Sequence, residues 1–352
     1  MEMARECETQ IPDQWRWKGR RAFLVDGSTI SLPDTPENQA AYPQSSSPAE
    51  GLGFPVMRVV ALLSLATAML TGLALGPCSG KETGETALFR ELLPLLLAGD
   101  LVVSDRYYSG WFTIALSQER GVDVVTRLHQ QRTADFRRGR RLGADDHLVE
   151  WPKPQRPEWL DQETYDRLPD TLCVREMQYA VREAGFRTQS LVVVTTLRDA
   201  DEVSREDLAD LYRQRWQVEV DLRSLKSTMK LDVLRCQTPE MARTELWMGL
   251  LAYNLVRHSL LQAADAAESS PRQLSFCAGQ QFLANTWLLA TTTPHTTASL
   301  IELRLIHRAS HPVGNRPNRT EPRALKRRAN PYDWLTKPRA EARAQLMAGC
   351  SP

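Results

Sequence analysis

The sequence predicts an α/β protein in which short apolar strands alternate with helices. Between residues 21 and 128, runs of strand length alternate with segments of helical spacing. Residues 130–200 have a different texture and are interpreted as a β-rich insertion, while 204–226 and 245–264 have the spacing of two long helices. Apolar residues make up 42% of the chain and charged residues 25%, which excludes wholesale disorder.

Each expected element has a local signal. In chain order, the expected elements before the insertion are a strand over 21–32, a proline-rich loop over 32–48, paired strands within 56–76, a helix over 86–98, a strand over 101–105, a helix over 111–120 and a strand over 123–128. Pro94 is expected to kink the helix that contains it or to end it early, and Gly121 to close the next. Residues 191–197 are rich in β-branched side chains, as strands are.

The two later helices differ in character. Ser204, followed three residues later by Asp207, resembles a capping box at the start of the first helix. The second helix, 245–264, is apolar round most of its surface and is therefore expected to be buried.

The 18 residues from Val59 to Gly76 contain no charge. That length is close to the lower limit for a membrane-spanning helix. A pair of buried strands explains the run better, because Thr71 and Gly72 fall where a turn could break it and no basic cluster flanks it.

Charge is informative only through its distribution. Forty-four Lys and Arg residues against 43 Asp and Glu leave a net charge of +1. Residues 131–141 nevertheless hold five Arg against one Asp, and residues 303–343 hold eleven basic against three acidic residues. These two segments are candidate DNA contacts, although the second is also typical of a disordered basic tail.

The cysteine and histidine residues do not form a recognisable metal-binding motif in the sequence. The six cysteines are scattered singly, which favours a reduced chain without structural zinc. Asp145, Asp146 and His147 could imitate a metal cluster, but their segment is polar and we expect them to be solvated.

One stripe of the 204–226 helix combines charges with aromatics. At about 100° per residue, Tyr212, Arg215, Glu219 and Lys226 lie within a narrow sector, with Trp216 and Arg223 beside it. A solvated charged face with an Arg215–Glu219 pair would explain the charges alone. An anionic ligand held beside a metal would also explain the aromatics.

Two aspartates follow apolar strands. Asp26 lies in FLVDGST and Asp105 ends LVVSD. A carboxylate within a buried strand is costly unless it is paired or binds a metal. The alternatives are a turn at Asp26-Gly27 and an ion pair between Asp105 and Arg106.

These motifs together carry a resemblance. The spacing Tyr212-x2-Arg215-x3-Glu219-x6-Lys226 resembles the YREK signature of insertion-sequence transposases of the IS-four type. DGST at 26–29 and SDRYYSGW at 104–111 look like the two aspartate motifs of that family, in the right order. The resemblance runs from about residue 20 to 265.

The resemblance implies an RNase H-like core, in which a mixed five-stranded sheet is flanked by helices, with a β-rich insertion between the second Asp and the Glu. The divisions it suggests are a short N-terminal segment 1–20, the first part of the core 21–129, the insertion 130–200, the second part of the core 201–265, and C-terminal helices with a basic tail 266–352.

The resemblance also implies a chemistry: DNA cleavage and strand transfer, as in cut-and-paste transposition. Asp26, Asp105 and Glu219 would be the catalytic residues and would bind Mg²⁺, for which Mn²⁺ could substitute, in two-metal phosphoryl transfer. The residues expected to contact DNA are Tyr212, Arg215, Lys226, Arg127 and Arg223. Trp151 and Trp159 are candidates for stacking on a flipped base, with packing as the alternative, and Trp216 is expected to pack beneath the site.

The expected partners are double-stranded DNA, as transposon ends and target, and a second copy of the chain in a dimer on DNA. We expect no membrane association and a cytoplasmic location at the nucleoid. Only 25 residues precede Asp26, whereas members of the family usually carry a helical end-recognition domain there. A shortened, non-cleaving DNA-binding or dimerising inhibitor is therefore the alternative function.

Overall fold

The sheet dominates the fold. The computed structural model describes residues 1–45, 49, 51–180, 190–292, 311–313 and 335–349. Within them, nine strands form one sheet in the order β3-β2-β1-β4-β5-β9-β8-β7-β6. The strands are β1 (Ala22–Ser31), β2 (Val56–Ser64), β3 (Leu70–Pro77), β4 (Leu101–Val103), β5 (Asp123–Arg127), β6 (Arg140–Gly143), β7 (Asp146–Pro152), β8 (Thr171–Ala180) and β9 (Ser190–Thr195). The predicted α/β class is confirmed.

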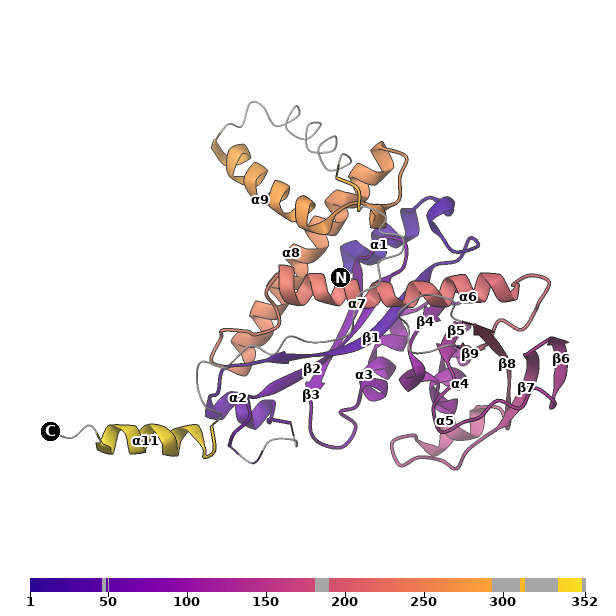
Figure 1. Ribbon diagram of the computed structural model, residues 1–352, viewed down its shortest axis with the longest axis horizontal. Helices are drawn as coiled ribbons and strands as arrows, with labels where there is room; N and C mark the ends of the chain where they lie inside the picture. The colour runs from indigo at the N-terminus through magenta and orange to yellow at the C-terminus, as the bar shows by residue number, and fades with distance from the viewer. Residues whose placement is uncertain (46–48, 50, 181–189, 293–310, 314–334, 350–352) are drawn as a thin grey trace.

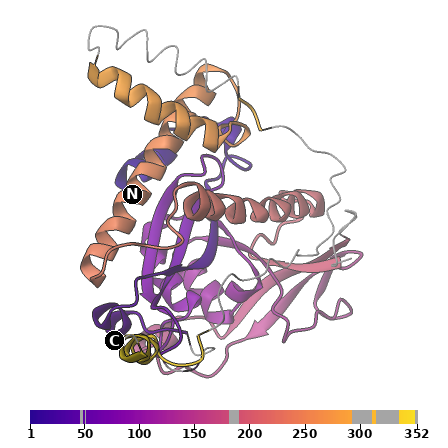
Figure 2. The ribbon, with the colours of Figure 1, turned by 60° about the vertical axis from the view of Figure 1, so that its left-hand side comes forward.

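Some helices pack on the two faces of the sheet and others extend away from it (Figure 1). They are α1 (Glu2–Gln10), α2 (Pro36–Ala41), α3 (Glu85–Leu92), α4 (Trp111–Glu119), α5 (Gln162–Arg167), α6 (Arg205–Arg213), α7 (Gln217–Arg223), α8 (Pro239–Ala266), α9 (Phe276–Thr292) and α11 (Arg339–Gly349), with short turns η1 (Asp13–Trp15), η2 (Leu93–Leu95), η3 (Arg106–Tyr108), η4 (Gln214–Trp216), η5 (Ser224–Thr228) and η6 (Pro271–Gln273). The segments from α6 to η5 form one rod that crosses the strands, and α8 and α9 extend to one side (Figure 1, Figure 2). The capping box predicted at Ser204 is present, with both of its hydrogen bonds.

Five strands, β3-β2-β1-β4-β5, form the mixed sheet that the family resemblance implied, with β1, β4 and β5 parallel and β2 and β3 antiparallel to their neighbours. The difference from the expectation is that the insertion extends this sheet. Strand β9 pairs antiparallel with β5, starting at Val125↔Thr195, and β8, β7 and β6 follow. This pairing covers an edge of β5 that would otherwise expose its backbone groups.

The uncharged segment Val59–Gly76 forms strands, as predicted, within β2 and β3. The turn lies earlier than expected, at residues 65–69, and Ala68 there has φ of 59°. Across the described part of the chain, none of the helices combines the length and apolar character needed to cross a membrane.

Two apolar cores lie on opposite faces of the sheet. Because side chains alternate along a strand, Leu24 of β1 faces one core and Val25 the other. The first core also contains side chains from α6, α7 and α8, including Leu208, Val218 and Leu250. The second contains side chains from α3 and α4, among them Leu88 and Ile114. The rod of α6 and α7 therefore covers the face toward which Leu24 points.

Local expectations were wrong at two places. Helix α2 lies inside the predicted proline-rich loop, because Pro36 is at its first turn and Thr35 caps it. Asp146 and His147 are buried rather than solvated, and Asp146 forms an ion pair with Arg175.

Helix α8 is buried on one face only. Its outward apolar side chains are between 41% and 61% exposed: Met241, Trp247, Met248, Leu251 and Leu255. The composition of α8 did not reveal this exposure. The helix is apolar on both faces, but only one of them packs on the core. Most of the basic segment 303–343 lies outside the described residues.

Candidate active site

Three candidate side chains share one row that runs from the middle of β1 across the segment just after β4 to the last residue of β5. The last register pairs join Leu24 of β1 with Val103 of β4, and Val103 with Val125 of β5. Two residues further along each chain come Asp26, Asp105 and Arg127. Neighbouring strands lie about 4.8 Å apart, so the fold brings together two aspartates that are far apart in sequence.

The same alternation sets their direction. Leu24, Val103 and Val125 all belong to the core beneath the rod of α6 and α7. Residues two positions along a strand point to the same face. The row of Asp26 and Asp105 is therefore on the face of the sheet that the rod covers, and this rod carries Glu219.

Asp26 is largely buried, with its side chain 21% exposed. Its Oδ1 accepts a hydrogen bond from Gly27 N at 2.9 Å, and Arg215 Nη1 lies 3.8 Å from Oδ2. Burial raises the pKa of the Asp26 carboxyl to about 6, because the Gly27 hydrogen bond and the Arg215 charge offset it only in part, and Asp105 and Glu85 add negative charge. A cation placed here would relieve that cost.

Asp105 begins the turn η3. Its Oδ1 accepts a hydrogen bond from Tyr107 N at 2.8 Å, and its carbonyl accepts one from the Thr126 hydroxyl. The alternative partner considered for it, Arg106, instead donates to Gln130 Oε1 at 3.3 Å.

Arg215 joins the rod to Asp26. Its Nη2 lies 2.6 Å from Glu219 Oε1, while its Nη1 faces Asp26. The i, i+4 ion pair predicted between Arg215 and Glu219 is therefore present, and the Glu219 side chain is 55% exposed. A guanidinium thus occupies the space between two of the three candidate carboxylates. No group of three or more metal-ligating side chains is already assembled among the residues that the structure describes.

The remaining candidate residues of the rod lie before and after the Arg215–Glu219 ion pair in the chain. Lys226 Nζ donates to Ser28 Oγ at 3.2 Å and to Thr29 O at 3.0 Å, which ties the end of the rod to the DGST segment of β1. Tyr212 is only 7% exposed, and burial raises the pKa of its hydroxyl above its ordinary value. Arg223 is exposed at the end of α7.

The candidate stacking tryptophans are both engaged in packing. Trp151 is 4% exposed, its ring faces the Arg132 guanidinium at 4.0 Å, and its Nε1 donates to Glu176 Oε1 at 2.9 Å. The ring of Trp159 faces the Arg90 guanidinium at 3.7 Å. Stacking on a base would require these arginines to move. The expectation that Trp216 packs beneath the site was wrong, because this side chain is 57% exposed.

Glu85 is a carboxylate near the site that sequence reasoning missed. It is the first residue of α3, and its side chain lies against Gly27. Burial raises the pKa of its carboxyl and the charge of Asp105 raises it further, against the opposing effects of Arg58 and of the Tyr108 hydroxyl. The only sequence signal was an acidic residue at a helix start, which is ordinary in any helix.

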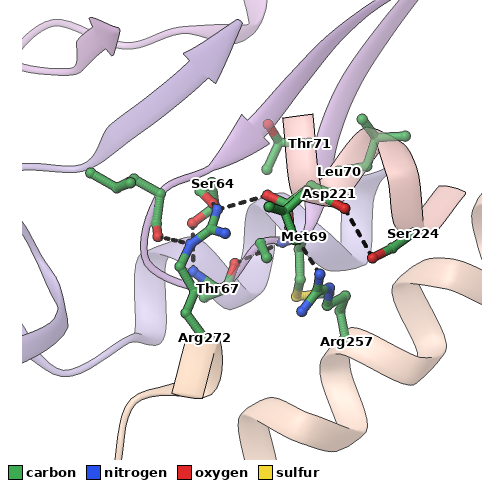
Figure 3. A network of polar contacts seen from close by, with 12 residues as sticks. Ser64, Thr67, Met69, Leu70, Thr71, Asp221, Ser224, Arg257 and Arg272 are labelled. Carbon is green, nitrogen blue, oxygen red and sulfur yellow. Dashed lines mark hydrogen bonds and ion pairs between the residues drawn. The ribbon is translucent and has the colours of Figure 1, made fainter. Parts of the chain in front are cut away.

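A buried ion network holds the rod from its other side (Figure 3). Asp221, 1% exposed, lies two residues from Glu219 on α7. Its Oδ1 accepts from Arg257 Nη2 at 2.9 Å, and Arg272 Nη2 lies 2.9 Å from its Oδ2. Arg272 also donates to the carbonyl of Ser64 at 2.7 Å, so the network links α7 with α8, η6 and the end of β2.

Comparison with known proteins identifies the family. The sequence model described as "Transposase DDE domain" matches residues 17–255, which contain the aspartate row and the rod. The chain belongs to this family of DDE transposase domains. The transposase InsG for insertion sequence element IS4 from Escherichia coli is 30% identical over 267 residues, covering 74% of this chain and 57% of InsG. The chain thus spans little more than half the length of that relative.

Two further similarities are more limited. The putative transposase InsL for insertion sequence element IS186A from Escherichia coli is 43% identical over 65 residues, 18% of each chain. A cryo-EM structure titled piggyBac transposase synaptic complex with hairpin DNA aligns over 92% of this chain and 66% of its own, with a TM-score of 0.47 and 10% identity. The family expected from the YREK spacing and the two aspartate motifs is confirmed by the family match and by InsG.

Proposed function

We propose that this DDE domain cleaves DNA and transfers strands in cut-and-paste transposition of an insertion sequence. The observation that carries the proposal is the row of Asp26 and Asp105 on adjacent parallel strands, linked through Arg215 to Glu219 on the rod. Membership of the DDE family supports the same reaction class. No metal-independent nucleophile of the Ser or Cys type is needed for this chemistry.

The residues present suit a divalent metal ion. Carboxylate oxygens are the ligands that Mg²⁺ prefers, and Mn²⁺ accepts the same set. The Arg215 guanidinium already places positive charge between Asp26 and Glu219, which marks where a cation is favoured. A bound divalent metal would supply activation of the attacking hydroxyl and neutralisation of the scissile phosphate. Asp26, Asp105 and Glu219 would hold it.

Other side chains would position the DNA. Once Arg215 leaves Glu219, its planar guanidinium can pair with phosphate oxygens through two hydrogen bonds. Tyr212, Lys226 and Arg127 border the same face of the sheet, and Arg223 is exposed further along the rod. Trp151 and Trp159 stay candidates for stacking on a base, subject to displacement of Arg132 and Arg90.

The direct test is cleavage of labelled DNA carrying the element's ends, with Mg²⁺ or Mn²⁺. We expect metal-dependent nicking that Asp105→Asn abolishes while its far-ultraviolet circular dichroism stays that of the unaltered protein. Asp210→Asn is the matched control, because Asp210 is an exposed carboxylate on α6 that pairs with neighbouring Arg213. Nicking by Asp105→Asn at the unaltered rate would reject the assignment.

A second function is favoured by one observation, the Arg215–Glu219 ion pair, which keeps Glu219 occupied. A DNA-binding inhibitor that does not cleave would retain this pair. Binding of the same DNA without nicking in any divalent metal would support the inhibitor and contradict the enzyme.

The assembly belongs to this proposal as well. We expect two copies on paired transposon ends, in the cytoplasm at the nucleoid. Light scattering of the chain with one labelled end would give a mass of two chains and two DNA molecules, whereas one chain on one DNA would contradict the dimer.

A further inference from the structure

Arg215 is shared between two of the three candidate metal ligands. Its Nη2 lies 2.6 Å from Glu219 Oε1, and its Nη1 lies 3.8 Å from Asp26 Oδ2. The side chains of Arg215 and Asp26 are only 20% and 21% exposed, so solvent screens this contact incompletely. Because like charges repel, a metal ion and this guanidinium cannot both occupy the space between the same two carboxylates.

Lys226, the other cation of the YREK spacing, binds uncharged groups instead. Its Nζ donates to Ser28 Oγ at 3.2 Å and to Thr29 O at 3.0 Å. A phosphate group that binds Lys226 therefore uncovers neither of the two carboxylates. A phosphate group that draws Arg215 away uncovers both, and a guanidinium suits this exchange because it can give a phosphate two parallel hydrogen bonds.

The backbone at Arg215 is not regular α-helix. Arg215 lies in η4, the 3₁₀ turn between α6 and α7, where hydrogen-bond geometry is poorer than in an α-helix. This turn is at the surface of the rod, since the next residue, Trp216, is 57% exposed. The guanidinium therefore has a solvent side from which a phosphate group can approach it.

We propose that Arg215 couples metal binding to DNA binding, because it holds Asp26 and Glu219 in the DNA-free chain and releases them to the metal ion when a DNA phosphate binds it. This inference rests on the proposed function, since it concerns regulation of the same site. A ligand shifts an equilibrium only when it favours one of the two states, and here DNA and metal both favour the released state. Each must then strengthen the binding of the other by the same factor.

The two contacts set the size of the effect. A single exposed ion pair four residues apart on a helix would favour the paired state only about twofold. The second contact, with the largely buried Asp26, adds to this pair. We therefore expect Arg215 to be released in about one-tenth of the DNA-free chains, which lowers the apparent metal affinity about tenfold.

The test is Mn²⁺ titration by calorimetry on the full chain, first without DNA. Arg215→Gln removes the guanidinium, and we expect it to bind Mn²⁺ about tenfold more tightly than the unaltered chain does. Arg213→Gln is the matched control, because Arg213 lies two residues away on the rod and pairs with Asp210, with both side chains more than half exposed. It removes the same charge without freeing either ligand, so its Mn²⁺ affinity should stay within about twofold of the unaltered value.

Mn²⁺ affinity of Arg215→Gln equal to or below that of the unaltered chain would overturn the inference. An equal gain in Arg213→Gln would overturn it too, because loss of any nearby positive charge would then suffice. Arg215→Lys keeps the charge but replaces the fork with a single ammonium, so its Mn²⁺ affinity should rise about threefold. No gain in Arg215→Lys would contradict the role of the shared contact, and this variant replaces Arg215→Gln if circular dichroism shows that the latter does not fold.

A second titration adds a saturating DNA duplex that ends at the terminus of the element, so that no flanking bond remains to be cut. DNA should raise the Mn²⁺ affinity of the unaltered chain by a factor about ten times larger than it does in Arg215→Gln. Equal increases in the two proteins would contradict the coupling, because DNA would then act on the metal site without Arg215.

The two proposals fail differently. If Asp26→Asn and Asp105→Asn weaken Mn²⁺ binding while Arg215→Gln does not strengthen it, the coupling fails and the proposed function stands. If none of these variants changes Mn²⁺ binding, the metal site of the proposed function fails.

Discussion

The Asp221 network allows the sharpest stability prediction. Asp221→Asn removes one negative charge that faces two guanidiniums, those of Arg257 and Arg272, in a place where Asp221 is 1% exposed. Removing one partner of a buried ion pair costs about 3–5 kcal/mol, because it leaves the other charge buried and uncompensated. Asn has the same shape, so the loss comes from the charge and not from a cavity.

The lower end of that range applies here. Arg257 Nε also donates to Tyr253 Oη at 3.0 Å, and Arg272 keeps its hydrogen bond to the Ser64 carbonyl. We therefore expect a loss of about 3 kcal/mol in the free energy of unfolding. With an unfolding entropy of about 2.1 cal/mol/K per residue and 352 residues, this corresponds to a fall of roughly 4 °C in the melting temperature.

The assay is urea unfolding followed by circular dichroism, compared with Asp210→Asn. Asp210 is 62% exposed and pairs with Arg213 three residues away, so its substitution should cost less than about 1 kcal/mol. An Asp221→Asn protein no less stable than Asp210→Asn would refute the reasoning, because buried and exposed pairs would then contribute alike.

Two further predictions concern buried carboxylates. The pKa of Asp26 is raised from 3.8 to about 6 in the folded chain, so its ionisation destabilises the metal-free fold progressively as pH rises from about 4 to 6 and fully above that range. Asp26→Asn should therefore stabilise the chain, in urea titrations with EDTA, by about 3 kcal/mol more at pH 7.5 than below pH 4; equal effects at both pH values would contradict the assignment. Glu176, 5% exposed, interacts with His147 Nε2 at 3.1 Å and accepts from Trp151 Nε1 at 2.9 Å. Glu176→Gln should cost about 1–3 kcal/mol in the same assay, because one amide oxygen replaces two carboxylate oxygens, and a neutral substitution would show that the two contacts contribute little.

The sequence predicts the features of the site that depend on residues close together in the chain. An aspartate directly after an apolar strand is visible in one dimension, and so is the spacing of Arg215 and Glu219 on a helix. The α/β class, the paired strands within 56–76 and the capping box at Ser204 depend on local patterns too, and the structure has them.

The features that sequence reasoning missed depend on long-range contacts. The pairing of β9 with β5 joins residues about 70 positions apart, so nothing local distinguishes a separate insertion from an extension of the sheet. Glu85 has an ordinary sequence context, and only its contact with Gly27 reveals where it points. The exposure of Trp216 and of one face of α8 likewise depends on which side packs, which apolar composition does not specify.

The central claim is that acidic side chains from separate segments form one divalent metal site. Fe²⁺ in place of Mg²⁺, with ascorbate and peroxide, cuts a polypeptide backbone close to the bound ion, and mass spectrometry maps the cuts. The account predicts cuts near residues 26, 105 and 219 together, all lost in Asp26→Asn. Cuts confined to one of these segments, or cuts elsewhere that Asp26→Asn leaves unchanged, would contradict it.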